Sequence, residues 1–304
     1  MTADTNQPVH LKASTPAELV AILPYLFGFT PSESVIVLAL RDRRVKAAAR
    51  VDAEAIDHPD DIAGRLQAVA VQGDLVVVVI WMSSVPEAER AARAMTDLLD
   101  GADQVIVVDA DQCRADDGPW TRWQTDVPEA RLAGLEVLSD RAALAAQVQG
   151  PPDGDKSVCG RWLAAQEAMG RHDQHWCHQR AGTLLQRGLD DVAWLSGDEL
   201  VELAALMREG DVRDGVWPYM TQEQARQQLA LWRAVVAAVP QQGAVAPLGL
   251  LAMAAWLSGE GALQTCCLER GRSIDPEHSL IRLGETINAM AVSPDRWSQI
   301  QGVH

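Results

Sequence analysis

Two hydrophobic patterns follow one another along the chain. The first part alternates short continuous apolar runs, which have the length of buried strands, with segments of helical spacing. The predicted strands occupy 35–40, 45–51, 75–81 and 104–108, and 135–138 is a further candidate strand. A predicted helix at 15–26 precedes the first strand, and predicted helices at 60–71 and 84–99 lie between later strands. This alternation is typical of an α/β domain.

In the second part, the hydrophobic period changes to 3.6 residues and stays there. Capping boxes at Ser196-x-x-Glu199 and Thr221-x-x-Gln224 mark the starts of two helices. Helices are expected at 197–208, 222–238, 247–257, 261–271 and 276–290, and a last one begins at Ser293-Pro294. The second part is therefore expected to be all-helical.

The order of the elements in the first part predicts its topology. A polar turn at 41–44 joins the first two strands into an antiparallel hairpin. The alternation from Val45 to Val108 then forms two right-handed crossovers that keep their strands parallel. We predict an N-terminal α/β domain with a mixed, mostly parallel sheet and helices on both faces, followed by an all-α helical domain.

The most linker-like segment separates these two parts. Residues 149–155 consist of Gly, Pro, Gln and Asp, with no large apolar side chain. The predicted organisation is a flexible N-terminus at 1–8, an α/β domain at 9–148, a linker at 149–157 and a helical domain at 158–304.

Charge and composition narrow the class of partner. The chain has 304 residues, of which 42 are Asp or Glu and 26 are Lys or Arg, for a formal charge of −16. Such a surface repels nucleic acids and anionic membranes, and no apolar run is long enough to span a bilayer. Five cysteines without a framework spacing favour reduced thiols in the cytoplasm. No cofactor is predicted.

Two groups of polar residues are candidates for a ligand site in the α/β domain. Glu33 and Ser34 precede the first strand, while Arg50 and Asp52 lie two positions apart and hence on one face of the second. A Glu33–Arg50 ion pair with turn hydrogen bonds explains the same residues structurally. Asp109 and Asp111 follow a parallel strand at its carboxyl end, where α/β sheets commonly bind ligands. These acids also fit a solvated loop.

The third candidate is a histidine cluster in the helical domain. His172, His175 and His178 follow one another at intervals of three residues, so neighbouring pairs can share a cation on a helix. A structural zinc needs four ligands, usually from two elements, and the sequence supplies no second pair. Surface histidines on a polar helix face are the alternative explanation.

Two stretches of the chain resemble a known family. Residues 24–34 fit the block Pro-Tyr-Leu-x-Gly-Phe-x-Pro-x-Glu-Ser, and residues 254–262 read Ala-Ala-Trp-Leu-Ser-Gly-Glu-Gly-Ala. Both are similar to an actinobacterial family recorded as a domain of unknown function, which implies no established activity. Residues 246–276 also resemble one tetratricopeptide unit, which implies a helix pair stacked on neighbouring helices.

These observations leave two functions open. The leading hypothesis is a non-catalytic, cytoplasmic protein-interaction or regulatory protein, whose helical domain contacts another protein or a second copy of the chain. The alternative is an enzyme or small-molecule sensor with its site at the carboxyl edge of the sheet.

Overall fold

The computed structural model of the chain describes residues 11–152, 154–297 and 299. The chain divides into two units: the first runs through Arg141 and includes Ala289–Ala291, and the second begins at Ala142. The predicted flexible stretch at 1–8 lies outside the described residues. The predicted linker at 149–157 falls within the second unit, and the predicted domain ranges stay a prediction.

The first unit contains a sheet with helices on both faces. Its elements are α1 (Pro16–Phe27), β1 (Ser34–Arg41), β2 (Arg44–Asp52), η1 (Ala53–Asp57), α2 (Pro59–Ala70), β3 (Leu75–Trp81), α3 (Val85–Leu98), β4 (Gln104–Asp109), β5 (Gln112–Ala115), β6 (Thr121–Arg122) and α4 (Pro128–Leu132). The strand order is β2-β1-β3-β4-β5-β6. The α/β prediction for this part of the chain is confirmed.

The predicted mixed sheet is confirmed, but the prediction that it is mostly parallel is wrong. Only β3 and β4 pair in parallel among the six described strands. β1 lies between β2 and β3 and runs antiparallel to both, so β2, β3 and β4 still share one direction. The physical reason is burial: the first six residues of β1 are buried, which a central position provides and an edge position does not.

The segment after β4 also differs from its prediction. A polar loop is expected after Val108, but β5 folds back on β4 through a turn in which Ala110 has a φ of +48°. Trp123 then packs edge-on against Trp81 with ring centroids 5.1 Å apart. This apolar contact anchors a segment whose polar sequence gives little strand signal. The candidate strand at 135–138 contributes only an isolated bridge between Leu138 and Phe29.

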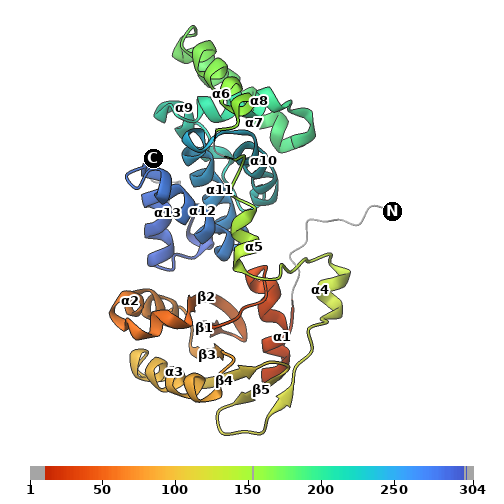
Figure 1. Cartoon of the computed structure of the whole chain (residues 1–304), viewed down its shortest axis with the longest axis vertical. Helices are drawn as coiled ribbons and strands as arrows, with labels where there is room; N and C mark the ends of the chain where they lie inside the picture. The colour runs from red at the N-terminus through yellow and green to blue at the C-terminus, as the bar shows by residue number, and fades with distance from the viewer. Residues whose placement is uncertain (1–10, 153, 298, 300–304) are drawn as a thin grey trace. The chain divides into compact units, whose positions relative to one another are not determined.

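The two sheet faces are covered by different helices (Figure 1). On one face, α1 packs Val20 and Leu23 against Ile36, Leu38 and neighbouring strand residues. On the other face, α2 and α3 pack against the alternate residues of the same strands. Successive side chains of a strand point to opposite faces of the sheet and thus enter two separate cores. Because both faces are buried, the strands are continuous apolar runs in the sequence.

The second unit is helical, as predicted. Its elements are α5 (Arg141–Ala146), α6 (Lys156–Met169), α7 (Gln174–Asp190), η2 (Val192–Trp194), α8 (Gly197–Leu206), α9 (Gly210–Asp214), η3 (Trp217–Tyr219), α10 (Ala225–Ala238), η4 (Gln241–Gly243), α11 (Val245–Ser258), α12 (Gly261–Ile274), α13 (Ser279–Ala289) and η5 (Pro294–Arg296). α11 is the centre of this unit, since every residue from Ala246 to Leu257 is buried. α10 and α12 pack against it.

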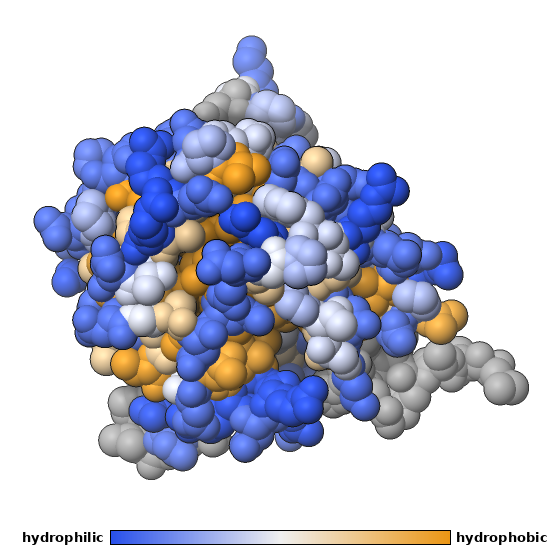
Figure 2. Space-filling model, turned by 90° about the horizontal axis from the view of Figure 1, so that it is seen from below, coloured by the Kyte–Doolittle hydropathy of each residue, from blue (hydrophilic) through white to orange (hydrophobic). Residues whose placement is uncertain are grey.

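Hydrophobic side chains on the surface are dispersed. The face drawn in Figure 2 shows hydrophobic areas separated by hydrophilic side chains. Exposed large apolar residues in the first unit lie on separate elements, including Leu26, Val71, Trp120 and Leu132. Single exposed apolar side chains of this kind are normal in globular proteins. No described helix is both long and apolar enough to cross a membrane.

Two glycines of the first unit provide a matched test of the sheet packing. A Cβ on Gly73 would lie 2.6 Å from the backbone N and O of Leu40, whereas one on exposed Gly64 within α2 meets nothing within 4 Å. Gly73→Ala is expected to lower the free energy of unfolding by about 2 kcal/mol, because backbone must shift. Gly64→Ala should raise it by about 0.5–1 kcal/mol. Calorimetry of both variants checks this, and equal stability would contradict the β1 packing.

Candidate functional site

Three of the four polar residues predicted where β1 starts and β2 ends lie together, because Arg50 contacts both Ser34 and Asp52. Arg50 Nε donates to Ser34 Oγ at 2.9 Å, and its Nη2 donates to Asp52 Oδ1 at 2.7 Å. Ser34 Oγ in turn donates to the carbonyl of Ser32 at 2.5 Å. The guanidinium lies 5.5 Å from the centre of the Phe29 ring, and its side chain is only 11% exposed. These contacts tie the segment before β1 to β2.

Glu33 lies beside this cluster but does not pair with Arg50 in the described residues. Its Oε1 accepts a hydrogen bond from the backbone N–H of Ser83 at 2.9 Å. Its carbonyl accepts another from the N–H of Ala53. The φ of +40° at Glu33 sets this orientation. The predicted ion pair is therefore wrong, because the carboxylate of Asp52 lies nearer on the same strand.

Asp109 and Asp111 lie at the same end of the sheet as Ser34 and Asp52. Across this end, Asp52 pairs with Ser34, Ser34 with Trp81, and Trp81 with Val108. Asp111 forms an exposed ion pair with Arg122, with Oδ2 and Nε 3.3 Å apart. Its carbonyl accepts a hydrogen bond from the N–H of Trp123, which holds the β4–β5 turn.

The three histidines do not converge on one point. The ring of His172 stacks on Trp176 with centroids 3.7 Å apart. His175 Nε2 contacts the amide of Gln179, while the two ring nitrogens of His178 contact the carbonyls of Gln174 and Asp211. Across the part of the chain that the structure describes, no three His, Cys, Asp or Glu side chains are placed to hold a metal.

His172 instead borders a pocket of about 480 Å³ in the helical unit, between the ends of α6 and α8, the start of α7, and α9. Cys177, Ala205 and Val212 form its buried floor. Polar side chains form its rim: Gln166, His172, Gln174, Arg208, Glu209 and Asp211. A concave site with an apolar floor and a few polar groups is the usual form of a binding site.

Two contacts fix the rim of this pocket. Gln174 Nε2 donates to Asp211 Oδ2 at 2.7 Å, which joins the start of α7 to α9. The guanidinium of Arg208 lies over the ring of Trp162, 5.9 Å from its centre. Burial raises the pKa of the Cys177 thiol, and the nearby carboxylates of Glu209 and Asp173 raise it further. The thiol is thus a neutral part of the floor at neutral pH.

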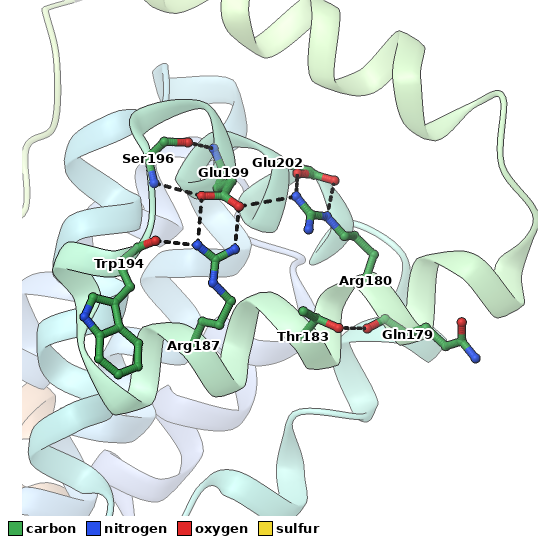
Figure 3. Close-up of polar contacts among 8 residues, drawn as sticks. All are labelled: Gln179, Arg180, Thr183, Arg187, Trp194, Ser196, Glu199 and Glu202. Atoms are coloured by element: carbon green, nitrogen blue, oxygen red, sulfur yellow. Dashed lines mark hydrogen bonds and ion pairs between the residues drawn. The ribbon is translucent and has the colours of Figure 1, made fainter.

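A network of charges holds α7 against α8, the two helices that supply part of the floor (Figure 3). Arg180 binds Glu202 through two hydrogen bonds of 2.8 and 2.7 Å. Arg187 binds Glu199 at 2.6 Å, and Glu199 also completes the capping box with Ser196. The Arg187 hydrogen bond and the Ser196 backbone N–H lower the pKa of Glu199 to about 2.

A family model described as a domain of unknown function, DUF4192, matches residues 16–295. The chain belongs to this family. The match includes both units and every residue of the pocket, so the helical unit is part of the DUF4192 domain. No curated protein and no solved structure matches the chain.

Sequence reasoning missed most of this pocket in the DUF4192 domain. Of the predicted site residues, only His172 lines it. The remaining lining residues come from the ends of four helices. A few residues at a helix end are too short a stretch to show a hydrophobic periodicity, so the sequence pattern does not identify them. The charged run Arg208-Glu209-Gly210-Asp211, which leads from the end of α8 into the start of α9, was the available signal, since a charged connection beside a glycine often carries function.

The α7–α8 network predicts a specific dependence of stability on pH. Glu199 has a pKa of about 2 when folded, below the value of about 4.3 in an unfolded chain. Its contribution to stability is complete above about pH 5 and is lost as the pH falls toward about 2. We expect Glu199→Gln to lower the free energy of unfolding by about 2 kcal/mol at neutral pH.

The difference between wild type and Glu199→Gln should shrink steadily between about pH 5 and 3 in urea unfolding experiments. Glu223→Gln is the matched control, since Glu223 is exposed and lies outside this network. A pH-independent difference for Glu199→Gln would show that the carboxylate is not stabilised by the arginine.

Proposed function

We propose that this chain is a non-catalytic, cytoplasmic binding protein that recognises a partner protein with its helical unit. The α6–α9 pocket carries the proposal, because it is concave, has an apolar floor and is bordered by exposed polar side chains. Protein interfaces concentrate their binding energy in a few anchor side chains that fill such pockets. The odd number of cysteines, five, and their lack of a framework spacing support a reducing compartment.

An exposed apolar side chain beside the pocket supports a protein partner. Leu163 on α6 is 56% exposed, one turn before the pocket residue Gln166. An exposed aliphatic side chain next to a pocket adds apolar contact area for a partner protein.

The edge of the sheet supports a structural role better than a ligand site. Arg50 binds both Ser34 and Asp52. Glu33 accepts a hydrogen bond from the backbone N–H of Ser83, in the connection between β3 and α3. A ligand would have to replace these contacts, at the cost of leaving a mostly buried guanidinium without its partners. The alternative function, an enzyme or small-molecule sensor with its site at this edge of the sheet, stays a prediction.

Photocrosslinking at the pocket tests the proposal. Benzoylphenylalanine in place of His172, in full-length protein made in its natural host, is expected to give a crosslinked polypeptide upon irradiation. Gly210→Trp in the same protein should reduce that product about tenfold, the effect of losing about 1.4 kcal/mol of contact energy. Gly210 lines the pocket, and a Cβ there would lie 3.8 Å from Arg213 Nη2, an ordinary contact distance.

Gly261→Trp is the matched control. Both glycines are exposed first residues of a helix, and a Cβ on Gly261 meets nothing within 4 Å, but Gly261 is outside the pocket. Benzoylphenylalanine at Leu132, an exposed position in the first unit, controls for random capture. Equal crosslinking from Leu132, or full crosslinking in Gly210→Trp, would refute the pocket as the contact site.

A further inference from the structure

The pocket rim carries carboxylate oxygens that the protein itself leaves open. Gln174 donates to Oδ2 of Asp211, while Oδ1 takes no hydrogen bond from the described residues. Within that same part of the chain, the Glu209 carboxylate has neither a hydrogen bond nor an ion pair. Its charge reaches the floor nonetheless, since it raises the pKa of the Cys177 thiol. Open carboxylates beside an apolar floor form a site for a cation.

The cation already present at the rim is directed elsewhere. Arg208 lies over the ring of Trp162, which is almost completely buried, and this contact orients the guanidinium toward the indole. Among the charged residues that line the pocket, the carboxylates of Glu209 and Asp211 outnumber the one guanidinium, that of Arg208. The pocket thus keeps a negative charge, in a chain whose formal charge is −16.

The shape of the rim favours a planar cation. The His172 ring is held in place by its stack on Trp176, with an interplanar angle of 12°. A guanidinium stacks on such a flat ring and binds carboxylates through parallel N–H donors, whereas an ammonium group offers a point charge. The half-buried side chain of Met169, which also lines the pocket, offers an apolar surface to the methylene stem of a long side chain.

We propose that the pocket binds an arginine side chain from an exposed, basic segment of the partner protein. The guanidinium binds Asp211 Oδ1 and the Glu209 carboxylate, and its stem lies against Met169. This inference rests on the proposed function and specifies the chemistry of the partner. The acidic surface of the chain also attracts a basic segment over a longer range and speeds encounter.

The test uses blocked pentapeptides and full-length protein labelled with ¹⁵N-glycine. Gly170 and Gly210 line the pocket and report binding there, while Gly182 and Gly261 are internal controls. Gly-Gly-Arg-Gly-Gly is expected to shift the Gly170 and Gly210 resonances saturably and leave the two controls in place. The same peptide with lysine should bind more weakly, and those with leucine or glutamate should produce no shift.

Glu209→Gln combined with Asp211→Asn should weaken binding of the arginine peptide at least about fivefold, as expected for losing charged hydrogen bonds. Glu223→Gln, exposed and outside the pocket, should leave the affinity unchanged. Equal weakening by both changes would assign the effect to net charge and overturn the inference.

Two further outcomes overturn it and differ in what they mean for the proposed function. Equal shifts with the leucine or glutamate peptide would refute a cationic ligand but support a binding pocket. No shift with the arginine peptide at about 10 mM would refute the arginine site. The proposed function is then decided by crosslinking at position 172, which does not depend on the charge of the partner.

Discussion

Two arginines of α7 and two glutamates of α8 set the position of one helix against the other. The bidentate contact between Arg180 and Glu202, and the 2.6 Å contact between Arg187 and Glu199, are met by only one relative placement of the helices. Desolvation offsets much of the energy of such partly buried pairs, so their main effect is to specify geometry. Because α7 supplies Cys177 and α8 supplies Ala205 to the pocket floor, the shape of the pocket follows from this placement.

The two units use charged side chains in opposite ways. At the edge of the sheet, Arg50 satisfies Ser34 and Asp52, and the result is a closed set of contacts that joins the start of β1 to the end of β2. At the pocket, Asp211 is held by a single donor and Glu209 by none within the described residues. Polar groups that are already paired stabilise a fold, whereas open ones beside an apolar surface are available to a ligand. This difference, more than the presence of charge, separates the structural cluster from the proposed binding site.

Local patterns in the sequence predicted the elements well and their arrangement less well. The apolar runs identified β1, β3 and β4, and the capping box at Ser196 marked a helix start that the structure confirms, whereas α10 begins at Ala225, later than the box at Thr221 predicted. The position of β1 between β2 and β3 was not predictable from those patterns, since it is chosen by burial across the whole sheet. The pocket escaped prediction for a similar reason. It combines the ends of helices that are separated in the sequence, so residues such as Cys177 and Asp211 share no local spacing.

We propose that the helical unit binds a partner protein through the α6–α9 pocket. Hydrogen–deuterium exchange of the crosslinked complex, compared with the free chain, locates the contact surface. We expect slower exchange of amides in α7 and α9 and at the end of α6, with unchanged exchange at Glu33–Asp52 and Asp109–Asp111. Slower exchange confined to the edge of the sheet would contradict it and place the binding site in the first unit.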